Sequence, residues 1–522
     1  VLQPRTLELF DDLGIVNDAL AAGLAVTCVN VYSRSGRKGS ATFGAAFLDS
    51  PYPNLVTLPQ DQTEALLAGL LSRLGGTVER GVELTGYLEN GDGVRAMLRH
   101  ADGRTEETTA RWIAGCDGAH STVRHVAKLG FEGISYPDEG LLGDVIVDWN
   151  IPQGQVTMCP QRDGFLLAFP LRGDRHFRVI MILPRNAKAD DRRLEFDEFH
   201  RQLVRMTPPG MGSQGGPPVI QRALWLTRYR LHRRGVRVYR RGSAFLAGDA
   251  AHIHSPVGAQ GMNTGIQDAY NLAWKMALVS NGDSPVALLD TYTFERHRIG
   301  EILLRGTDRL FAAAAGSGHI STFFRSVAPR FAARLASVPY VNRKLVHFVS
   351  QLGIRYRTSP LSDEGPGAKG LERGAPRAGD RAPDAAITDI ESGAERLFDL
   401  FRGPHYTLLL FSGDSPTDQA WRNSIQEMLG RLVRVVGVSM SPANANRDAI
   451  DLSGEAHRKY GAKGGAIYLI RPDGYIGFRG GPFDNAALES DLAWRFIPVL
   501  ESLTPRKSPA APSLPIPPES PD

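Results

Sequence analysis

The segment of residues 243–280 constrains the fold more than any other part of the chain. Residues 243–247, Ser-Ala-Phe-Leu-Ala, have the composition of a buried strand, and residues 263–280 have the pattern of a long helix. The loop between them is rich in glycine and proline, so its backbone can lie against a flat ligand without clashes from Cβ atoms. A plain strand–loop–helix connection does not need so many glycines. The segment therefore predicts a ligand-binding site in an α/β fold.

The ends of this loop, which we call the GD loop (residues 248–263), carry candidate binding groups. Gly248-Asp249 directly follows the strand, where the carboxylate can accept hydrogen bonds from sugar-alcohol hydroxyls. Met262 and Asn263 open the helix, whose free N–H groups and positive dipole end favour an anionic ligand. His252 and His254 lie within the loop, and we expect them to make structural hydrogen bonds rather than to act in catalysis.

A second loop with the same character follows the short apolar segment 112–115. Residues 116–124, Cys-Asp-Gly-Ala-His-Ser-Thr-Val-Arg, form what we call the DG loop. Its Asp117-Gly118 pair places a carboxylate and exposed N–H groups at the carboxyl edge of a sheet, where open α/β folds bind ligands. The alternative is a tight turn that caps a helix.

At these two loops the chain resembles the flavin aromatic hydroxylases, the group that includes p-hydroxybenzoate hydroxylase, phenol hydroxylase and the aromatic-polyketide hydroxylases. The resemblance spans about residues 1–357. Asp117-Gly118 matches the loop that touches both FAD and NADPH in the family, and Gly248-Asp249 matches the loop whose carboxylate binds the ribityl chain. Residues 256–263 would run along the isoalloxazine ring, with backbone groups of the last three residues on its pyrimidine side.

Two further positions follow from the resemblance alone. Gln60 precedes a predicted helix over residues 61–75 and matches a glutamine that contacts the ribityl chain and phosphate; its alternative is a polar loop residue. Leu84 falls where the family passes backbone beside the adenine. The cofactor-binding residues implied by the resemblance are Gln60, Leu84, Asp117, Gly118, Gly248, Asp249, Pro256, Gly258, Gly261, Met262 and Asn263.

The resemblance also implies the domain organisation. Residues 1–137 and 241–360 would form an FAD-binding, Rossmann-like α/β domain. The family begins with a strand, a GxGxxG turn and a helix, and we expect this first βαβ unit upstream of Val1. Residues 138–240 contain short alternating segments broken by Gly, Pro and charge, which predict an α+β substrate domain with an antiparallel sheet.

The C-terminal part reads as a separate unit. Residues 361–385 are rich in Gly, Pro and charge without periodicity, which predicts a linker. Residues 386–504 resemble the thioredoxin-like C-terminal domain of phenol hydroxylase, but no cysteine follows Cys159, so thiol chemistry is excluded there. We expect a removable structural unit, with homodimer contacts as one role. The Pro/Ser-rich tail, residues 505–522, predicts disorder.

The composition of the chain indicates which kinds of binding partner to expect. The net charge is +4 and arginines are spread along the chain, so the pI of 8.9 does not indicate nucleic-acid binding. No stretch approaches the length of a transmembrane helix and no signal peptide is recognisable, which favours a cytoplasmic protein without a membrane partner. The three cysteines show no metal-ligand spacing, so we expect no metal site.

The resemblance implies a monooxygenase that hydroxylates a phenolic or aromatic-polyketide substrate. NADPH or NADH would reduce FAD, O2 would add at the flavin C4a position, and the hydroperoxide would transfer oxygen to the ring. Because the cofactor does this chemistry, no catalytic side chain is assigned. The substrate would bind between the GD loop and the sheet of residues 138–240. Trp225, Arg228 and Tyr229 are candidates there, with ordinary strand residues as the alternative.

Two other functions stay open at this point. One is a different FAD oxidoreductase, such as a halogenase or an antibiotic-modifying monooxygenase. The other is a non-catalytic flavoprotein remnant. Bound flavin and substrate-stimulated oxidation of NADPH separate an enzyme from a remnant.

Overall fold

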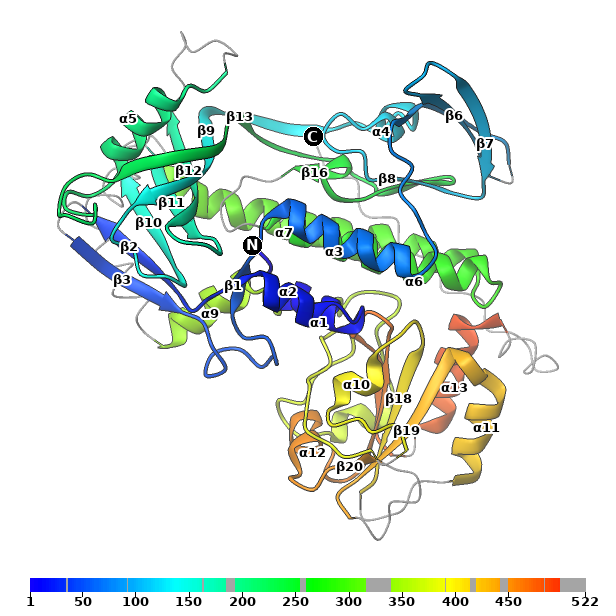
Figure 1. Cartoon of the computed structure of the whole chain (residues 1–522). Helices are drawn as coiled ribbons and strands as arrows, with labels where there is room; N and C mark the ends of the chain where they lie inside the picture. Colours follow the sequence, from blue (N-terminus) through cyan, green and yellow to red (C-terminus); the bar gives the residue numbers. More distant parts are fainter. Residues whose placement is uncertain are drawn as a thin grey trace. The chain divides into compact units, whose positions relative to one another are not determined.

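The computed structural model (Figure 1) describes residues 1–33, 36–91, 93–161, 164–184, 193–253, 260–315, 339–389, 391–413, 419–441, 449–482 and 484–497. The chain divides into two compact units. The first comprises Val1–Ala269 and Arg296–Gly353, and the second Tyr270–Glu295 and Ile354–Asp522. Among the described helices, none combines the length and the apolar character needed to cross a membrane. Pro256, Gly258 and the tail 505–522 lie outside the described residues.

An eight-stranded sheet dominates the first unit, in the order β16-β13-β9-β12-β11-β10-β2-β3. Most pairs are antiparallel, and β10 pairs with β2 in parallel. The strands are β2 (Cys28–Ser33), β3 (Gly36–Thr42), β9 (Glu132–Asp148), β10 (Gln155–Gln161), β11 (Gly164–Pro170), β12 (His176–Pro184), β13 (Val219–Gly235) and β16 (His252–Ile253). Residues 138–240 supply most of this sheet, but β2, β3 and β16 come from outside that range.

Helix α5 (Phe196–Met206) covers one face of this sheet (Figure 1). Phe199 and Leu203 of the helix pack with alternate residues of β9, such as Leu141 and Val145. Alternation follows from the strand period of two, which sends successive side chains to opposite faces. Gly143 belongs to the helix-facing set because a Cβ there would lie 2.7 Å from Phe199 Cζ.

The remaining strands and helices of the first unit carry the two loops. In the sheet β14-β15-β8, β15 runs parallel to β8. A separate sheet has the order β5-β6-β7, and β1 pairs with β4. The strands are β1 (Leu24–Val26), β4 (Leu55–Thr57), β5 (Val82–Glu89), β6 (Val94–His100), β7 (Thr105–Ala110), β8 (Ile113–Gly115), β14 (Arg240–Arg241) and β15 (Ala244–Leu246). The helices of this unit are α1 (Pro4–Asp12), α2 (Val16–Ala22), α3 (Gln60–Arg73), α4 (Thr122–Val126) and α9 (Pro339–Val349). Helices α6 (Gly261–Ser280) and α7 (Asp290–Ala315) each contain residues of both units.

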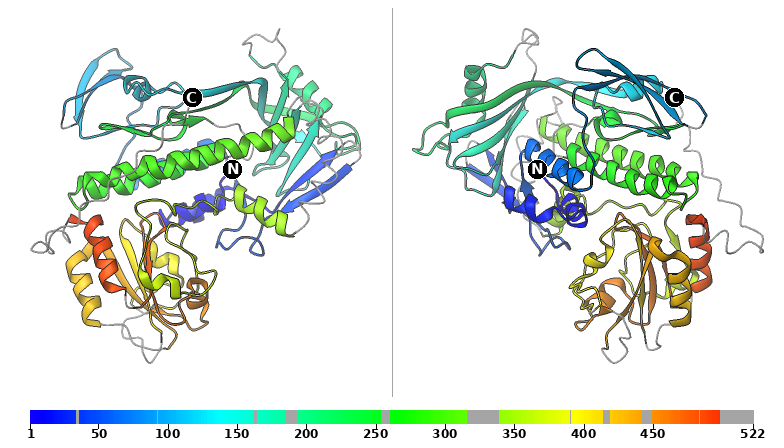
Figure 2. Two further views of the ribbon diagram at one scale, coloured as in Figure 1. Left: turned by 180° about the vertical axis from the view of Figure 1, so that it is seen from behind. Right: turned by 45° about the vertical axis from the view of Figure 1, so that its right-hand side comes forward.

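The second unit is built on a six-stranded mixed sheet in the order β17-β22-β21-β18-β19-β20. Helices α11 and α13 lie on one side of this sheet, and α10 and α12 lie on the other (Figure 2). The elements are β17 (Asp363–Glu364), α10 (Leu397–Phe401), β18 (Tyr406–Phe411), α11 (Gln419–Leu429), β19 (Val433–Ser439), β20 (Ala449–Ile450), α12 (Glu455–Tyr460), β21 (Ala466–Ile470), β22 (Ile476–Gly480) and α13 (Asn485–Arg495).

The predicted linker at residues 361–385 is wrong. Its Asp363–Glu364 segment is strand β17, which pairs in parallel with β22. Ala378, Ala382 and Ala385 are buried in the core of the second unit. Small side chains on an irregular backbone fill this space, so no periodicity marked the segment as part of a core. The second unit also takes in Tyr270–Glu295, and therefore does not begin at residue 386.

A buried ionic network joins these segments of the second unit. Glu295 accepts from Lys275 Nζ at 2.8 Å and from Arg471 Nη1 at 2.6 Å, and Arg471 Nη2 also binds Asp473 at 2.6 Å. Burial lowers the pKa of Lys275 to about 8. Although burial opposes it, Arg471 and Lys275 hold the pKa of Glu295 well below its usual range. Each buried charge is compensated, so loss of one partner leaves another unpaired.

Candidate functional site

The DG and GD loops leave adjacent parallel strands at the same edge. Leu246 of β15 pairs with Gly115 of β8, and the Ala247 N–H donates to the Gly115 carbonyl at 3.0 Å. Both loops therefore start side by side at the carboxyl ends of their strands. The sequence predicted a strand before each loop, but not that the two strands are neighbours. This is the position at which open α/β sheets bind ligands.

Arg124 links the two loops directly. Its Nη1 donates to the Ala250 carbonyl of the GD loop at 2.9 Å, and its Nη2 donates to the Ala119 carbonyl of the DG loop at 2.7 Å. The guanidinium carbon lies 3.9 Å from the centroid of the Phe131 ring. The side chain is buried, so these hydrogen bonds are shielded from water. Sequence reasoning assigned no role to Arg124.

Asp268, two turns into α6, fixes the turn at Gly248. Its Oδ2 accepts from the Gly248 N–H at 3.1 Å and from His252 Nε2 at 2.7 Å, and its Oδ1 accepts from Arg296 Nε at 2.7 Å. Burial alone would raise its pKa, but the charges of Arg296 and His252 lower the pKa of Asp268 to about 2. The structural role expected for His252 is confirmed, and Asp268 is a positioning residue that sequence reasoning missed.

Gly248 and Gly265 bring the turn and the helix together. Gly248 has a φ of +59°, in the left-handed region that side chains disfavour. A Cβ on Gly265 would lie 3.3 Å from the Gly248 Cα. Glycine at position 248 thus suits the left-handed backbone, and glycine at position 265 lets the first turns of α6 approach the GD turn without a tight contact.

Asp249 is the group of this turn that remains available to a ligand. It is half-buried, and burial raises its pKa. Within the part of the chain that the structure describes, no donor binds its carboxylate. A partly desolvated carboxylate of this kind fits hydroxyl groups of a ribityl chain, because they supply the missing donors.

Asn263 uses its side chain to hold α6 against the start of the chain. Its Oδ1 accepts from the Gln3 N–H at 3.0 Å and from Thr6 Oγ1 at 2.7 Å, and its Nδ2 donates to the Val1 carbonyl at 2.8 Å. Met262 packs with leucines of α3 in an apolar cluster. Because these side chains already have partners, backbone groups of this turn are the candidates for contact with a ligand; the predicted backbone role stays a prediction.

Buried glutamine side chains form hydrogen bonds around the first turn of α6. Gln351, at a φ of +59°, donates from Nε2 to Gln260 Oε1 at 2.5 Å and to Thr264 Oγ1 at 3.1 Å. Its Oε1 accepts from Gln267 Nε2. A buried residue in this strained conformation persists only where surrounding contacts over-determine it. The hydrogen bonds of Gln351 to Gln260, Thr264 and Gln267 thus help to position the start of α6.

Gln60 and Leu84 are the two predicted cofactor-binding residues that lie outside the DG and GD loops. Gln60 is exposed, opens α3 and donates to Glu64 Oε1 at 3.2 Å. Leu84 is half-buried in β5, against which helix α4 of the DG loop packs. No hydrogen bond among the described residues joins either side chain to Asp117 or Asp249. Their binding roles remain predictions.

The two loops follow adjacent parallel strands and are linked by Arg124. They are accompanied by the half-buried Asp249 carboxylate and by the N-terminus of α6. This arrangement is that of a dinucleotide-binding α/β protein. Comparison with known proteins narrows this class. Residues 1–307 match the FAD binding domain family, and residues 375–496 match the family described as aromatic-ring hydroxylase, C-terminal. The chain belongs to the FAD-dependent aromatic-ring monooxygenases.

Its relatives span most of its length. The 6-methylpretetramide 4-monooxygenase of Streptomyces rimosus is 31% identical over 92% of this chain and 83% of its own. The pentachlorophenol 4-monooxygenase of Sphingobium chlorophenolicum is 30% identical over 92% of this chain and 86% of its own. Among solved structures, the OxyS anhydrotetracycline hydroxylase of Streptomyces rimosus is similar with a TM-score of 0.73 and 27% identity, over 95% of this chain and 90% of that one.

Proposed function

We propose that this protein hydroxylates a phenolic or polycyclic aromatic substrate with O2, FAD and NADPH or NADH. The observation that carries the proposal is the pair of clamped loops with the Asp249 carboxylate left for a ligand. Relatives named for the oxygenation of 6-methylpretetramide and of pentachlorophenol support an aromatic substrate. They also favour oxygenation over halogenation.

The residues of the two loops would hold the cofactor. Asp249 accepts hydrogen bonds from the ribityl hydroxyls, while Asp268 and Arg124 keep the loops in place. The N–H groups of Gly261 and Met262 at the start of α6 would stabilise the negative charge that the flavin ring gains on reduction, because the helix dipole has its positive end there. Bound FAD, once reduced, supplies the activation of O2. Gln60, Leu84, Asp117 and Gly118 complete the proposed contacts, together with Pro256 and Gly258.

The substrate would lie on the sheet face opposite α5. Arg228 is not available there, because its Nη1 binds Glu139 at 2.8 Å and its Nη2 binds Glu198 of α5 at 2.7 Å. Tyr229, the next residue of β13, points to the other face and packs in a different apolar cluster. Of the three residues predicted on this strand, Trp225 and Tyr229 therefore stay in the proposal and Arg228 is assigned to the helix-facing side.

The second unit has a structural role in this proposal. Its mixed sheet with helices on both sides supports a thioredoxin-like fold. Because the sequence contains no cysteine after Cys159, the unit has no thiolate for disulfide exchange.

The test is oxidation of NADPH and NADH by the purified, FAD-loaded protein with a panel of phenols and hydroxylated polycyclic aromatics. We expect an aromatic compound to stimulate oxidation and to gain one oxygen atom in its mass spectrum. A chlorinated product would instead indicate a halogenase. Tight FAD binding with no stimulated oxidation by any of these compounds would contradict the proposal.

A further inference from the structure

The face of the eight-stranded sheet opposite α5 is only partly covered. Along β9, the residues that face α5 are buried, whereas Leu142, Asp144 and Ile146 on the other face are half-exposed. Along β12, Arg178 and Ile180 on the same face are also half-exposed. Their cross-strand pairing, Arg178 with Asp144 and Ile180 with Leu142, places them side by side.

Apolar and aromatic side chains lie on this face around the Arg178–Asp144 pair. Tyr229 of β13 is paired with Gly140 of β9, and a Cβ on Gly140 would lie 2.2 Å from Tyr229 Cζ. The glycine therefore makes room for the tyrosine ring to lie across the neighbouring strand. Ile180 and Tyr229 pack against the buried cluster that contains Phe165 and Phe169. A planar ring system can stack on such a surface.

One ion pair interrupts this apolar surface. Arg178 Nε donates to Asp144 Oδ1 at 2.8 Å, and Arg178 Nη2 donates to Asp144 Oδ2 at 2.8 Å. The side chains are 26% and 14% exposed, so the pair is partly desolvated yet reachable. Within the described residues, Arg178 Nη1 makes no hydrogen bond. The two parallel hydrogen bonds fix the guanidinium plane and leave this nitrogen as a donor.

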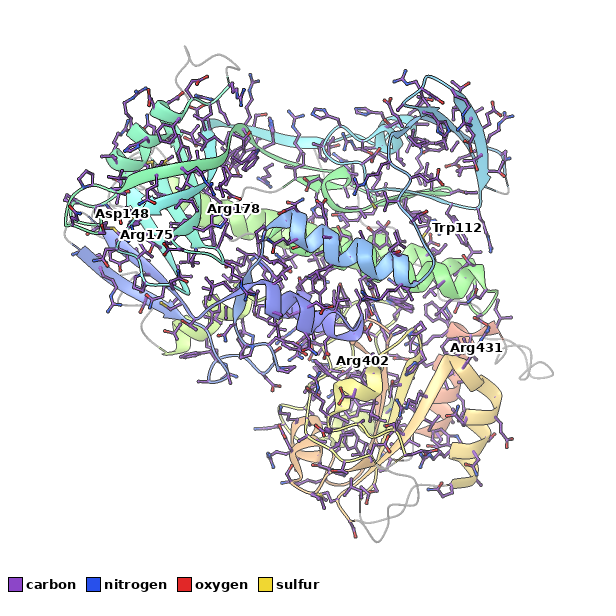
Figure 3. All side chains as sticks on the ribbon, in the orientation of Figure 1. Trp112, Asp148, Arg175, Arg178, Arg402 and Arg431 are labelled. Atoms are coloured by element: carbon purple, nitrogen blue, oxygen red, sulfur yellow. The ribbon has the colours of Figure 1, made fainter. Side chains whose placement is uncertain are left out.

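The pair lies toward the proposed cofactor side of the first unit. The hydrogen bonds that Arg178 donates to Asp144 raise the pKa of Arg178, although burial opposes the rise. The charges of Asp144 and of Asp61, in the first turn of α3, add to it. Arg178 is therefore within electrostatic range of the start of α3, next to Gln60. In Figure 3, Arg178 lies nearer to α3 than the neighbouring pair Arg175 and Asp148 does.

For stacking of an aromatic ring alone, an uncharged apolar surface would be sufficient. An ion pair on this surface has a cost in free energy, because its charges are partly removed from water. The pair adds a donor and an acceptor side by side. Arg178 offers Nη1, and the Asp144 carboxylate retains lone pairs beyond the two it uses. A carbonyl oxygen next to a phenolic hydroxyl on the same ring system presents the complementary acceptor and donor.

We propose that Arg178 and Asp144 form the specificity-determining anchor for the substrate, and that this substrate is a planar aromatic compound with a hydroxyl beside a carbonyl. The carbonyl accepts from Arg178 Nη1 through the lone pair that its intramolecular hydrogen bond leaves, the hydroxyl shares its hydrogen between this carbonyl and Asp144, and the ring lies over Ile180 and Tyr229. The inference rests on the proposed aromatic hydroxylation and names its substrate class. A site built to hydrogen-bond a substrate discriminates against the analogue that lacks the group.

The experiment compares two probes of the same ring size with the FAD-loaded protein. 1-Hydroxyanthraquinone carries the hydroxyl beside a carbonyl, and 1-hydroxyanthracene lacks the carbonyl. Dissociation constants are measured from the perturbation of flavin absorbance, without NADPH. We expect the wild-type protein to prefer the quinone, and Arg178→Met to weaken quinone binding about ten- to hundredfold, as for a charged hydrogen bond. Binding of 1-hydroxyanthracene should change little.

Two further variants make the result decisive. Arg175→Met is the matched control, since Arg175 binds Asp148 at 3.0 Å on the same sheet but is 46% exposed; it should leave both constants unchanged. Arg178→Lys keeps the cation opposite Asp144 and should restore part of the selectivity even if Arg178→Met folds poorly.

The inference is overturned if the wild-type protein binds neither probe or does not distinguish them. It is also overturned if an FAD-loaded Arg178 variant keeps full selectivity. Because binding is measured without turnover, these outcomes are separate from a failure of the proposed hydroxylation. If the protein binds the quinone selectively but no compound stimulates NADPH oxidation, only the proposed hydroxylase activity is contradicted.

Discussion

Arg124 of the DG loop donates a hydrogen bond of 2.9 Å to the carbonyl of Ala250 in the GD loop, across 126 positions of sequence. One buried cation therefore holds both loops of the proposed FAD site in register. Charge-assisted hydrogen bonds of this kind are stronger than neutral ones, and their loss leaves buried carbonyls without a donor.

We predict that Arg124→Met weakens FAD binding by about 1.5–3 kcal/mol, the range for hydrogen bonds to charged groups. The measurement is FAD retained after dialysis, followed by titration of the apoprotein. Arg111→Met, at an exposed arginine close to the DG loop, is the control and should retain FAD. Equal FAD affinity in both variants would mean that the loops do not need this link.

Asp249→Ala removes the one carboxylate of the GD turn that accepts no hydrogen bond from the described residues. Because ribityl hydroxyls are its proposed donors, FAD affinity should fall by about one to two powers of ten. Protein stability without FAD should hardly change, since no residue that the structure describes donates a hydrogen bond to this carboxylate. Unaltered flavin content in the variant would remove Asp249 from the site.

Asp268 makes stability depend on pH in the acid range. Its folded pKa, about 2, lies below the ordinary value, so its contribution is fully present above about pH 5 and is lost as the pH falls toward 2. Asp268→Asn should lower the free energy of unfolding by about 3–5 kcal/mol at neutral pH, because Arg296 and His252 lose their counter-charge. Urea unfolding between pH 7 and about pH 3 should show a flatter profile for the variant; parallel profiles would contradict this assignment.

The buried network of the second unit predicts that this unit is not a removable module. Arg471→Met leaves Glu295 and Asp473 undercompensated and should cost about 3–5 kcal/mol of unfolding free energy. Removal of the chain after residue 365 should prevent Tyr270–Glu295 from packing, in contrast to the expectation from sequence. Thermal unfolding is the measurement. The control is Arg431→Met, whose side chain is 72% exposed and labelled in Figure 3; it should cost about 1 kcal/mol or less.

Local patterns were sufficient to predict the two loops and their strands. Gly248-Asp249 and Asp117-Gly118 each closely follow a run of apolar residues, so the neighbouring sequence is enough to predict that they lie at the end of a strand. The clamps could not be predicted this way. Gln351 lies 91 positions from Gln260, and the Ala250 carbonyl that accepts from Arg124 lies 126 positions away in the GD loop, so neither pairing leaves a local signal.

The predicted linker at residues 361–385, and with it the predicted start of the C-terminal unit, was wrong for a related reason. Turns and alanines such as Ala382 carry no periodic pattern, yet they fill space against the sheet of the second unit. The split of Arg228 and Tyr229 onto opposite faces was implicit in the strand period. The partner that decides the role of Arg228, Glu198 on α5, became visible only in the fold.

The most direct test of the proposed aromatic hydroxylation is to follow the oxygen atoms of O2 into the product. The FAD-loaded protein is supplied with NADPH or NADH, isotopically labelled O2 and the aromatic compound that stimulates oxidation most. Mass spectrometry of the product should show one labelled oxygen atom on the ring, formed in step with the reduced nicotinamide consumed. Hydrogen peroxide as the only product, or ring oxygen derived from water, would contradict the account.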